Sequence, residues 1–297
     1  MSLDPTFHAK HDQRLHGDRR TTPHSHADCL SLFTSSKSIT YLNHEATTVR
    51  LTSPSGPRTT FRIFGSPYSP RCGLWGFSYD RDTTTAELSS HEASPPPEQR
   101  QHEPSATRLW ESIPSTADIV VTHTPPRGHL DDRAGAVTGA GCEALRRRLA
   151  RVRPILSVCG HVHGGRGAQR VSWPAAPDSG GGDEARDAVV VTPWEDPSPE
   201  ATSSKMSLVD LTGRRGGAAA AAALASKAAS AFGSGSGAAA ASAAAYRERK
   251  ETCIVNAAIV GTDYPHIGGK QLNKPIVVDV ELPVWEEDVP DEQASTA

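Results

Sequence analysis

The sequence predicts a mixed α/β domain, and three features of the 297-residue chain indicate it. Short runs of β-branched residues recur between Pro, Gly and Asn residues, which is typical of short strands and their turns. Residues 141–151 place their apolar side chains on one helical face. This segment lies between two apolar runs, so strand, helix and strand follow one another as in a β-α-β unit.

In the first half of the chain, strands are expected where β-branched and aromatic residues gather. Thr60-Phe-Arg-Ile-Phe64 alternates apolar and polar residues and ends at Gly65-Ser66-Pro67, which favours a turn. Asp118-Ile-Val-Val-Thr122 is a nearly continuous apolar run, which is typical of a buried strand. The expected elements are a helix ending near Leu32, strands at 39–42, 47–51 and 60–64, a loop at 71–79, a helix at 106–113 and a strand at 118–122.

In the second half, the helix at 141–151 is the clearest element, because its arginines occupy the face opposite the apolar one. Pro154 follows it closely, as is usual just beyond the end of a helix. The remaining apolar runs predict strands. These are residues 155–158, 188–191, 208–211, 252–259 and 275–280.

We expect residues 1–297 to form one domain that is interrupted by low-complexity segments. Residues 84–106 are polar and contain a Pro triplet, so a disordered loop is expected there. Residues 174–250 are interpreted as an insertion. Its Ala, Ser and Gly tract at 214–247 has no apolar stripe and is expected to be mostly disordered. The acidic tail, 287–297, is expected to fray.

Composition and charge argue against several classes of protein. A net charge of −3 and a pI of about 6.5 do not favour a surface for nucleic acid or membranes. No run approaches the roughly 18 apolar residues of a membrane span. The five cysteines are widely spaced and form no CxxC pair, which argues against a disulfide framework and a zinc ribbon. We therefore expect a cytoplasmic protein with no nucleic-acid or membrane partner.

Three histidines are the candidate metal ligands. His123 follows the apolar run 118–122, and His161 and His163 follow the run 155–158. Ligand sites of open α/β sheets form at such strand ends, so the three imidazoles are expected at one edge of the sheet. Imidazole binds divalent transition metals, and the expected cofactor is Mn, Fe, Zn or Ni. The alternative is a polar loop in which the three histidines have no special role.

Thr122-His-Thr-Pro-Pro126, followed by Gly160-His-Val-His163, resembles the calcineurin-like metallophosphoesterases, and most closely the fungal members of the metallophosphoesterase-domain-containing branch. Further segments carry the same resemblance and cover nearly the whole chain outside the low-complexity tracts. They are 64–70, 75–77, 153–154, 194–197, 207–211, 251–258 and 273–279.

The resemblance implies a β-sandwich flanked by helices, with two metal ions at the strand ends. It implies that His123 and His161 bind one metal ion and that His163 binds the other. The implied reaction is hydrolysis of a small phosphorylated substrate, a phosphomonoester or a phosphodiester such as a nucleotide, by a metal-activated hydroxide. Its substrate-binding residues are unknown.

Four other residues lie near these motifs. Arg127, His129 and Asp131 are possible substrate contacts, although the default expectation for them is that of solvated loop residues. Asn256 lies near the end of a late strand, and a structural role is expected for it.

The sequence departs from the family pattern in its first part. The pattern also has DxH, GDxxD and GNH[DE] motifs, which supply the bridging Asp, the Asn ligand and the histidine that assists the leaving group. Gly17-Asp18 matches only two letters, and Asn43-His44-Glu45 has Leu42 in place of the Gly and is interpreted as a chance match. No catalytic residue is therefore identified.

We expect the family domain to be incomplete at its N-terminal side and its phosphoesterase activity to be impaired. The alternative function is that of a non-catalytic remnant that binds a nucleotide or a protein partner.

Overall fold

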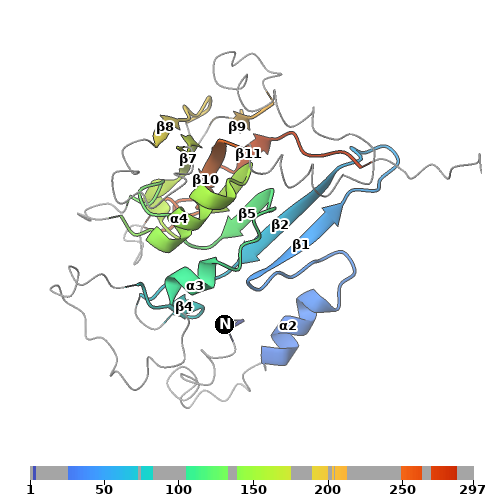
Figure 1. The fold of residues 1–297 in the computed structure, drawn as a ribbon, viewed down its shortest axis with the longest axis horizontal. Helices are drawn as coiled ribbons and strands as arrows, with labels where there is room; N and C mark the ends of the chain where they lie inside the picture. Colours follow the sequence, from blue (N-terminus) through green and yellow to red (C-terminus); the bar gives the residue numbers. More distant parts are fainter. Residues whose placement is uncertain are drawn as a thin grey trace, which may run out of the picture.

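The computed structural model describes residues 3–4, 26–72, 75–82, 105–132, 139–174, 189–199, 203, 205–212, 249–262 and 269–285. Within these ranges, a seven-stranded sheet forms the centre of the fold (Figure 1). Its strands, in spatial order, are β1 (Glu45–Arg50), β2 (Thr60–Ser66), β5 (Ile119–Thr122), β6 (Leu156–Cys159), β10 (Glu251–Asn256), β7 (Gly167–Ser172) and β8 (Val190–Pro193). Strands β2, β5, β6 and β10 run parallel, whereas β1, β7 and β8 are antiparallel to their neighbours.

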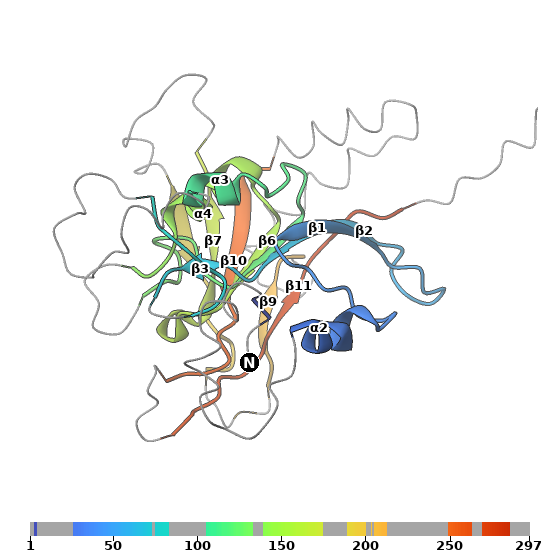
Figure 2. The ribbon, with the colours of Figure 1, turned by 90° about the horizontal axis from the view of Figure 1, so that it is seen from below.

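The two faces of this sheet are covered differently. Helices α3 (Ala106–Trp110) and α4 (Glu143–Val152) pack on one face, and the parallel strands β9 (Ser207–Asp210) and β11 (Ile276–Asp279) pack on the other (Figure 2). The other described elements are α2 (His26–Thr34), β3 (Ser69–Pro70), β4 (Ser78–Tyr79) and the 3₁₀ turn η2 (His163–Gly165). The prediction of a mixed α/β fold is thus confirmed.

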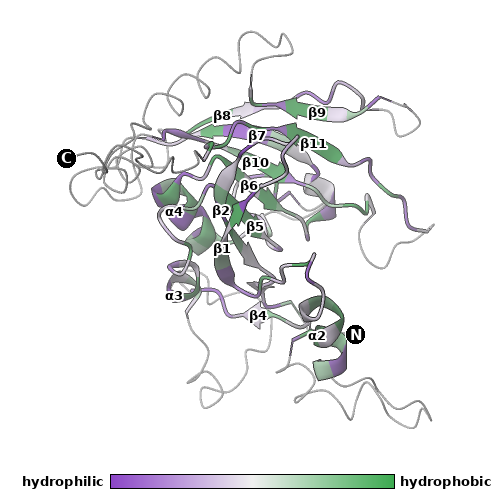
Figure 3. Ribbon diagram, turned by 90° about the vertical axis from the view of Figure 1, so that its right-hand side faces the viewer, coloured by the Kyte–Doolittle hydropathy of each residue, from purple (hydrophilic) through white to green (hydrophobic). Residues whose placement is uncertain are grey.

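Strand β10 shows why its central residues, Cys253 to Val255, are all apolar. Ile254 packs into the core beneath the helices, whereas Cys253 and Val255 pack into the core beneath β9 and β11. Successive strand residues point to opposite faces, so a strand that is covered on both sides buries apolar residues in succession. Helix α4 is buried on one side only, through Leu145 and Leu149, and Figure 3 shows hydrophobic and hydrophilic residues side by side along it.

The last described residues lie against the β1–β2 hairpin. The backbone N–H of Thr60 donates to the carbonyl of Pro283 at 2.9 Å, and that of Trp285 donates to the carbonyl of Arg58 at 2.8 Å. The indole N–H of Trp285 donates to the carbonyl of Leu51 at 3.0 Å. These bonds place a segment from the far end of the described chain alongside the start of β2.

Several of the predicted elements differ from the structure in detail, and the strand expected at 252–259, for example, ends at Asn256. The expected strand at 39–42 has no regular secondary structure. Its Leu42 instead packs on Gly65, where a Cβ would lie 2.8 Å from the Cβ of Leu42. An apolar run of four residues without a hydrogen-bonded neighbour does not form a strand, and here β1 begins only at Glu45. The helix expected at 106–113 ends three residues early.

The low-complexity segments fall largely outside the described residues. This holds for the tract at 214–247, for the tail at 287–297 and for most of the loop at 84–106. The end of that loop is an exception, because Ser105 caps α3 through its hydroxyl, which accepts from the N–H of Arg108 at 3.2 Å. Strands β8 and β9 lie within the expected insertion, and they pair with β7 and β11. Among the described helices, none combines the length and apolar character that crossing a membrane requires.

Candidate metal centre

Two of the candidate ligands, His123 and His161, lie together because the predicted β-α-β unit forms. Strands β5 and β6 pair in parallel, and their carboxyl ends meet at one edge of the sheet. His123 follows the end of β5, and its N–H donates to the carbonyl of Ser66 at the end of β2 at 3.0 Å. The N–H of Gly160, just after β6, donates to the carbonyl of His123 at 3.1 Å. The backbone therefore fixes both histidine-bearing loops at their first residues.

The rings of His123 and His161 face each other, with centroids 4.7 Å apart and planes 56° apart. His161 has a φ of 64°, in the left-handed region that L residues seldom adopt. Its ring also meets the half-exposed indole of Trp75 edge to face, at 5.7 Å between centroids. A strained residue that the surroundings hold in place is typical of functional sites.

His163 begins the turn η2 and is oriented by one carbonyl. Its Nδ1 lies 2.7 Å from the carbonyl oxygen of Thr262. Because a carbonyl oxygen can only accept, Nδ1 carries the proton, and Nε2 is the nitrogen with a lone pair. A carbonyl that holds the other ring nitrogen is the usual support of a histidine that binds metal. Desolvation, and then the proximity of His163, lower the pKa of His123 and favour the neutral imidazole that a metal requires.

The three histidines do not form a complete metal-binding group by themselves. Within the described ranges, no three or more His, Cys, Asp or Glu side chains lie close enough together to hold a metal ion. The structure thus brings the rings of His123 and His161 together, and His163 lies close enough to His123 to lower its pKa. Neutral imidazoles are suitable donors for a divalent first-row metal, but such an ion needs further ligands to complete its shell.

Asn256 joins the two histidine-bearing loops. Its side chain is fully buried, and its amide donates to the carbonyl of Leu130 at 2.9 Å and to that of Val162 at 2.8 Å. The Asn256 side-chain oxygen accepts from the N–H of Ala258 at 3.0 Å. These bonds describe the structural role expected for Asn256. Gly165 belongs to the same joint, because a Cβ there would collide with the carbonyl of Leu130.

Two of the possible substrate contacts support the loop from inside. His129 and Asp131 are only 4% and 2% exposed, so the expectation that they are solvated loop residues is wrong. Nδ1 of His129 accepts from the side-chain amide of Gln169 at 2.6 Å, and a carboxylate oxygen of Asp131 accepts from the N–H of Gly141 at 2.9 Å. The third residue, Arg127, is half-buried and donates through its backbone N–H to the carbonyl of Cys142.

His44, in the chance match to the GNH[DE] motif, is a half-buried histidine with partners at both ring nitrogens. Its Nε2 donates to the carbonyl of Leu109 at 3.1 Å, so its Nδ1 accepts from the hydroxyl of Ser66 at 2.9 Å. The ring packs edge-on against three aromatic rings, and burial lowers its pKa. These contacts explain the residue without a metal.

The residues that orient the candidate ligands were not indicated by the sequence. Thr262 acts through a backbone carbonyl, which has no residue signature. Asn256 could have been suspected, because an amide at the end of an otherwise apolar strand needs partners when it is buried.

No protein-family profile matches the chain. The chain is similar to a human protein named metallophosphoesterase domain-containing protein 1, with 32% identity over 146 residues, 49% of this chain and 35% of that protein. It is 34% identical over 152 residues to a protein of Emericella nidulans named probable rhamnogalacturonate lyase C, which covers 50% of this chain and 12% of that protein. A UPF0046 protein of Caenorhabditis elegans is 30% identical over 105 residues, 35% of this chain and 21% of that protein. The matched regions thus span 12% to 35% of the length of these relatives.

Proposed function

We propose that the chain belongs to the metallophosphoesterase family and that its chemistry is metal-dependent hydrolysis of a phosphomonoester or phosphodiester. The observation that carries this proposal is the pairing of His123 and His161, with rings 4.7 Å apart, at the ends of two parallel strands. The similarity to metallophosphoesterase domain-containing protein 1 supports it. The name of the rhamnogalacturonate lyase describes a protein of which only 12% is matched, and we do not extend it to this chain.

In this proposal the metal is Mn, Fe, Zn or Ni. His123 and His161 hold one ion, and His163 contributes to a second. A bound ion of this kind neutralises phosphoryl oxygens and provides a nucleophile near neutral pH. The chain's own contribution is positional, since Asn256 keeps the two loops in register and Thr262 keeps the proton of His163 on Nδ1.

We further propose that hydrolysis by this chain is slow. Within the part of the chain that the structure describes, no carboxylate completes a three-ligand group with the histidines. The same observation favours a second function, that of a non-catalytic module that binds a small phosphorylated molecule such as a nucleotide, or a protein partner. In either case we propose that the central sheet with β9 and β11 corresponds to the β-sandwich of the family.

We place the protein in the cytoplasm, acting on a small phosphorylated molecule. All five cysteines are free thiols, and four of them are buried, which fits a reducing compartment.

Hydrolysis of bis(4-nitrophenyl) phosphate by the full chain with added Mn²⁺ or Ni²⁺ tests the proposal. We expect slow turnover that EDTA abolishes and that His161→Ala removes. His26→Gln is the matched control, because it changes a histidine on α2, outside the candidate site. Metal binding by calorimetry without turnover supports the second function. An absence of both metal binding and turnover overturns the proposed hydrolysis.

A further inference from the structure

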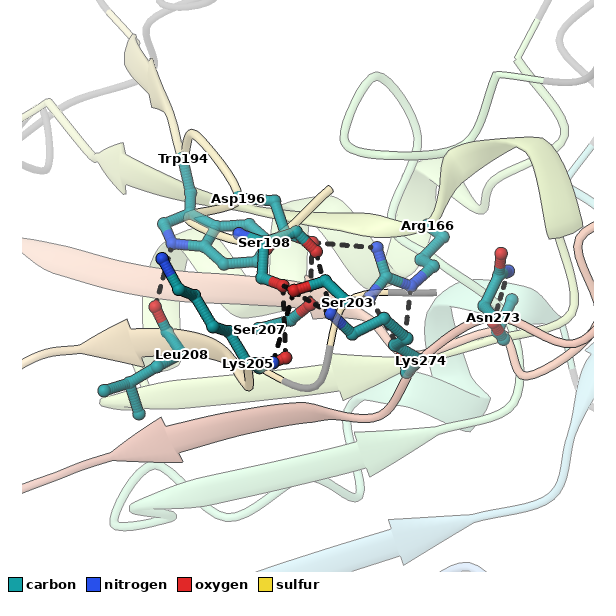
Figure 4. Close-up of polar contacts among 11 residues, drawn as sticks. Arg166, Trp194, Asp196, Ser198, Ser203, Lys205, Ser207, Leu208, Asn273 and Lys274 are labelled. Atoms are coloured by element: carbon teal, nitrogen blue, oxygen red, sulfur yellow. Dashed lines mark hydrogen bonds and ion pairs between the residues drawn. The ribbon is translucent and has the colours of Figure 1, made fainter. Parts of the chain in front are cut away.

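Arg166 lies three residues after His163, and its guanidinium is held on several sides (Figure 4). Nε and Nη2 both donate to the carbonyl of Lys274, at 3.2 and 2.8 Å. Nη1 pairs with a carboxylate oxygen of Asp196 at 3.4 Å, and Nη2 donates to the hydroxyl of Ser207 at 3.3 Å. The backbone N–H of Arg166 donates to the carbonyl of His163 at 3.4 Å, so this side chain is anchored at the end of the histidine turn.

The partners of Arg166 are themselves fixed. The same oxygen of Asp196 accepts from the hydroxyl of Ser207 at 2.8 Å, and its other oxygen accepts from the N–H of Ser198 at 2.8 Å. The ammonium of Lys274 donates to the carbonyl of Ser198 at 3.0 Å. Figure 4 shows these side chains converging from the loop after β8 and from the starts of β9 and β11. Arg166 is therefore held by a hydrogen-bonded frame, which consists of Asp196, Ser198, Ser207 and Lys274, rather than by a single partner.

Asn273 precedes Lys274 in the chain and connects the partners of Arg166 to the segment that orients His163. Its backbone N–H donates to the carbonyl of Ile259 at 2.7 Å, and its side-chain amide donates to the carbonyl of Ala258 at 2.9 Å. Gly261 approaches Asn273 closely, since a Cβ at this glycine would lie 2.9 Å from the side-chain oxygen of Asn273. The segment 258–262 is thus held along residues 271–274, and it ends at the carbonyl of Thr262 that orients His163.

We propose that Arg166 and Asn273 are positioning residues for the metal-binding nitrogen of His163. The contacts close a ring that runs from His163 through Thr262, Asn273 and Lys274 to Arg166, and back along the chain to His163. The ring fixes the carbonyl of Thr262 relative to the imidazole, and so fixes both the tautomer and the orientation of that imidazole. This inference rests on the proposed function, in which His163 binds metal.

A lysine cannot replace the planar guanidinium of Arg166. Nε and Nη2 both donate to the carbonyl of Lys274 while Nη1 pairs with Asp196, whereas the ammonium of a lysine provides only a point charge. Loss of the groups that orient a metal-binding histidine typically lowers metal affinity by about 10- to 100-fold. We expect a decrease of that size in Arg166→Lys and in Asn273→Asp, which keeps the shape of the side chain but removes its amide donor.

The test uses the full chain and two measurements. Titration with Co²⁺, followed by visible absorption, gives the metal affinity. Long-range ¹H–¹⁵N NMR of histidine-labelled, metal-free protein gives the tautomer of His163, whose signal is identified by its loss in His163→Asn. Lys205→Ala is the matched control, because this exposed residue neighbours the same frame without a side-chain bond to Arg166 or Asn273.

In the metal-free wild type and in the control we expect one tautomer of His163, with the proton on Nδ1. In the two variants we expect a mixture of tautomers and weaker Co²⁺ binding. A single unchanged tautomer and unchanged affinity in a folded Asn273→Asp or Arg166→Lys overturn the inference. If wild-type Co²⁺ binding does not depend on His163, the proposed metal role fails instead, and the metal-free tautomer still decides whether the ring positions the imidazole.

Discussion

Acidification should destabilise this fold through His129. The ring is 4% exposed, accepts a hydrogen bond from Gln169 and packs edge to face against Trp173. Burial, and then the positive charge of Arg146, lower its pKa to about 4, although the nearby carboxylates of Asp131 and Glu143 act in the opposite direction. The folded protein therefore keeps His129 neutral at pH values where an unfolded chain has already bound a proton.

The sign and size follow from this difference in pKa. Above pH 6.5 neither state binds the proton, and His129 makes no pH-dependent contribution to the free energy of unfolding. As the pH falls from 6.5 to 4, only the unfolded state gains the proton, so the folded state loses stability. A difference of about 2.5 pKa units at 1.36 kcal/mol per unit gives a loss of about 3 kcal/mol by pH 4.

Urea unfolding at pH 7 and at pH 4, followed by tryptophan fluorescence, measures this loss. His129→Asn is the matched variant, because its side-chain oxygen can accept from Gln169 but does not titrate. We expect the wild type to lose about 3 kcal/mol more than the variant between the two pH values. The other titrating groups, including His44, are present in both proteins. Equal losses in the two proteins would refute the reasoning.

Three further results are expected. Asn256→Leu leaves the buried carbonyls of Leu130 and Val162 without their donor and should lower the free energy of unfolding in urea by about 3 kcal/mol; a loss below about 1 kcal/mol would contradict the joint described above. Gly165→Ala forces the two histidine-bearing loops apart and should cost about 1–3 kcal/mol in the same assay, with weaker Co²⁺ binding; unchanged binding would count against the close packing. Trp285→Ala removes a cation–π contact with Arg50 at 3.7 Å, worth about 1 kcal/mol, and should speed hydrogen exchange in the β1–β2 hairpin before the rest of the sheet; uniform exchange would refute a local role.

The local pattern of the sequence was sufficient for β5, β6 and the paired histidines, but it did not indicate β7, which pairs with β10 in the same sheet. The runs at 118–122 and 155–158 are mostly apolar because Val120 packs into the core beneath the helices, whereas Ile119, Leu156 and Val158 pack toward β9 and β11. Such a pattern is visible without a structure. The helix between them makes the two strands parallel neighbours, which brings His123 and His161 to one edge. Residues 39–42 have a similar composition, but whether they pair depends on a neighbouring strand that the local sequence does not describe.

The support of the site could not be read in the same way, because its partners are distant in the chain. In the sequence, His129 and Asp131 resemble solvated loop residues. In the structure they are buried, and hydrogen bonds from Gln169 and Gly141 offset the cost of removing them from water. The orientation of His163 depends on a backbone carbonyl 99 residues away. Residue type gives no signal for such a carbonyl, and its position follows only from the complete topology.

The contact of Trp285 with the β1–β2 hairpin has a consequence for the folding of the protein during its synthesis. Its indole N–H reaches the carbonyl of Leu51 across 234 positions of sequence. Contacts over such separations form late, because a long loop must close before they provide any stabilisation. During synthesis the hairpin leaves the ribosome long before residues 283–285. The backbone groups of Arg58 and Thr60 therefore gain these partners only after that segment has emerged.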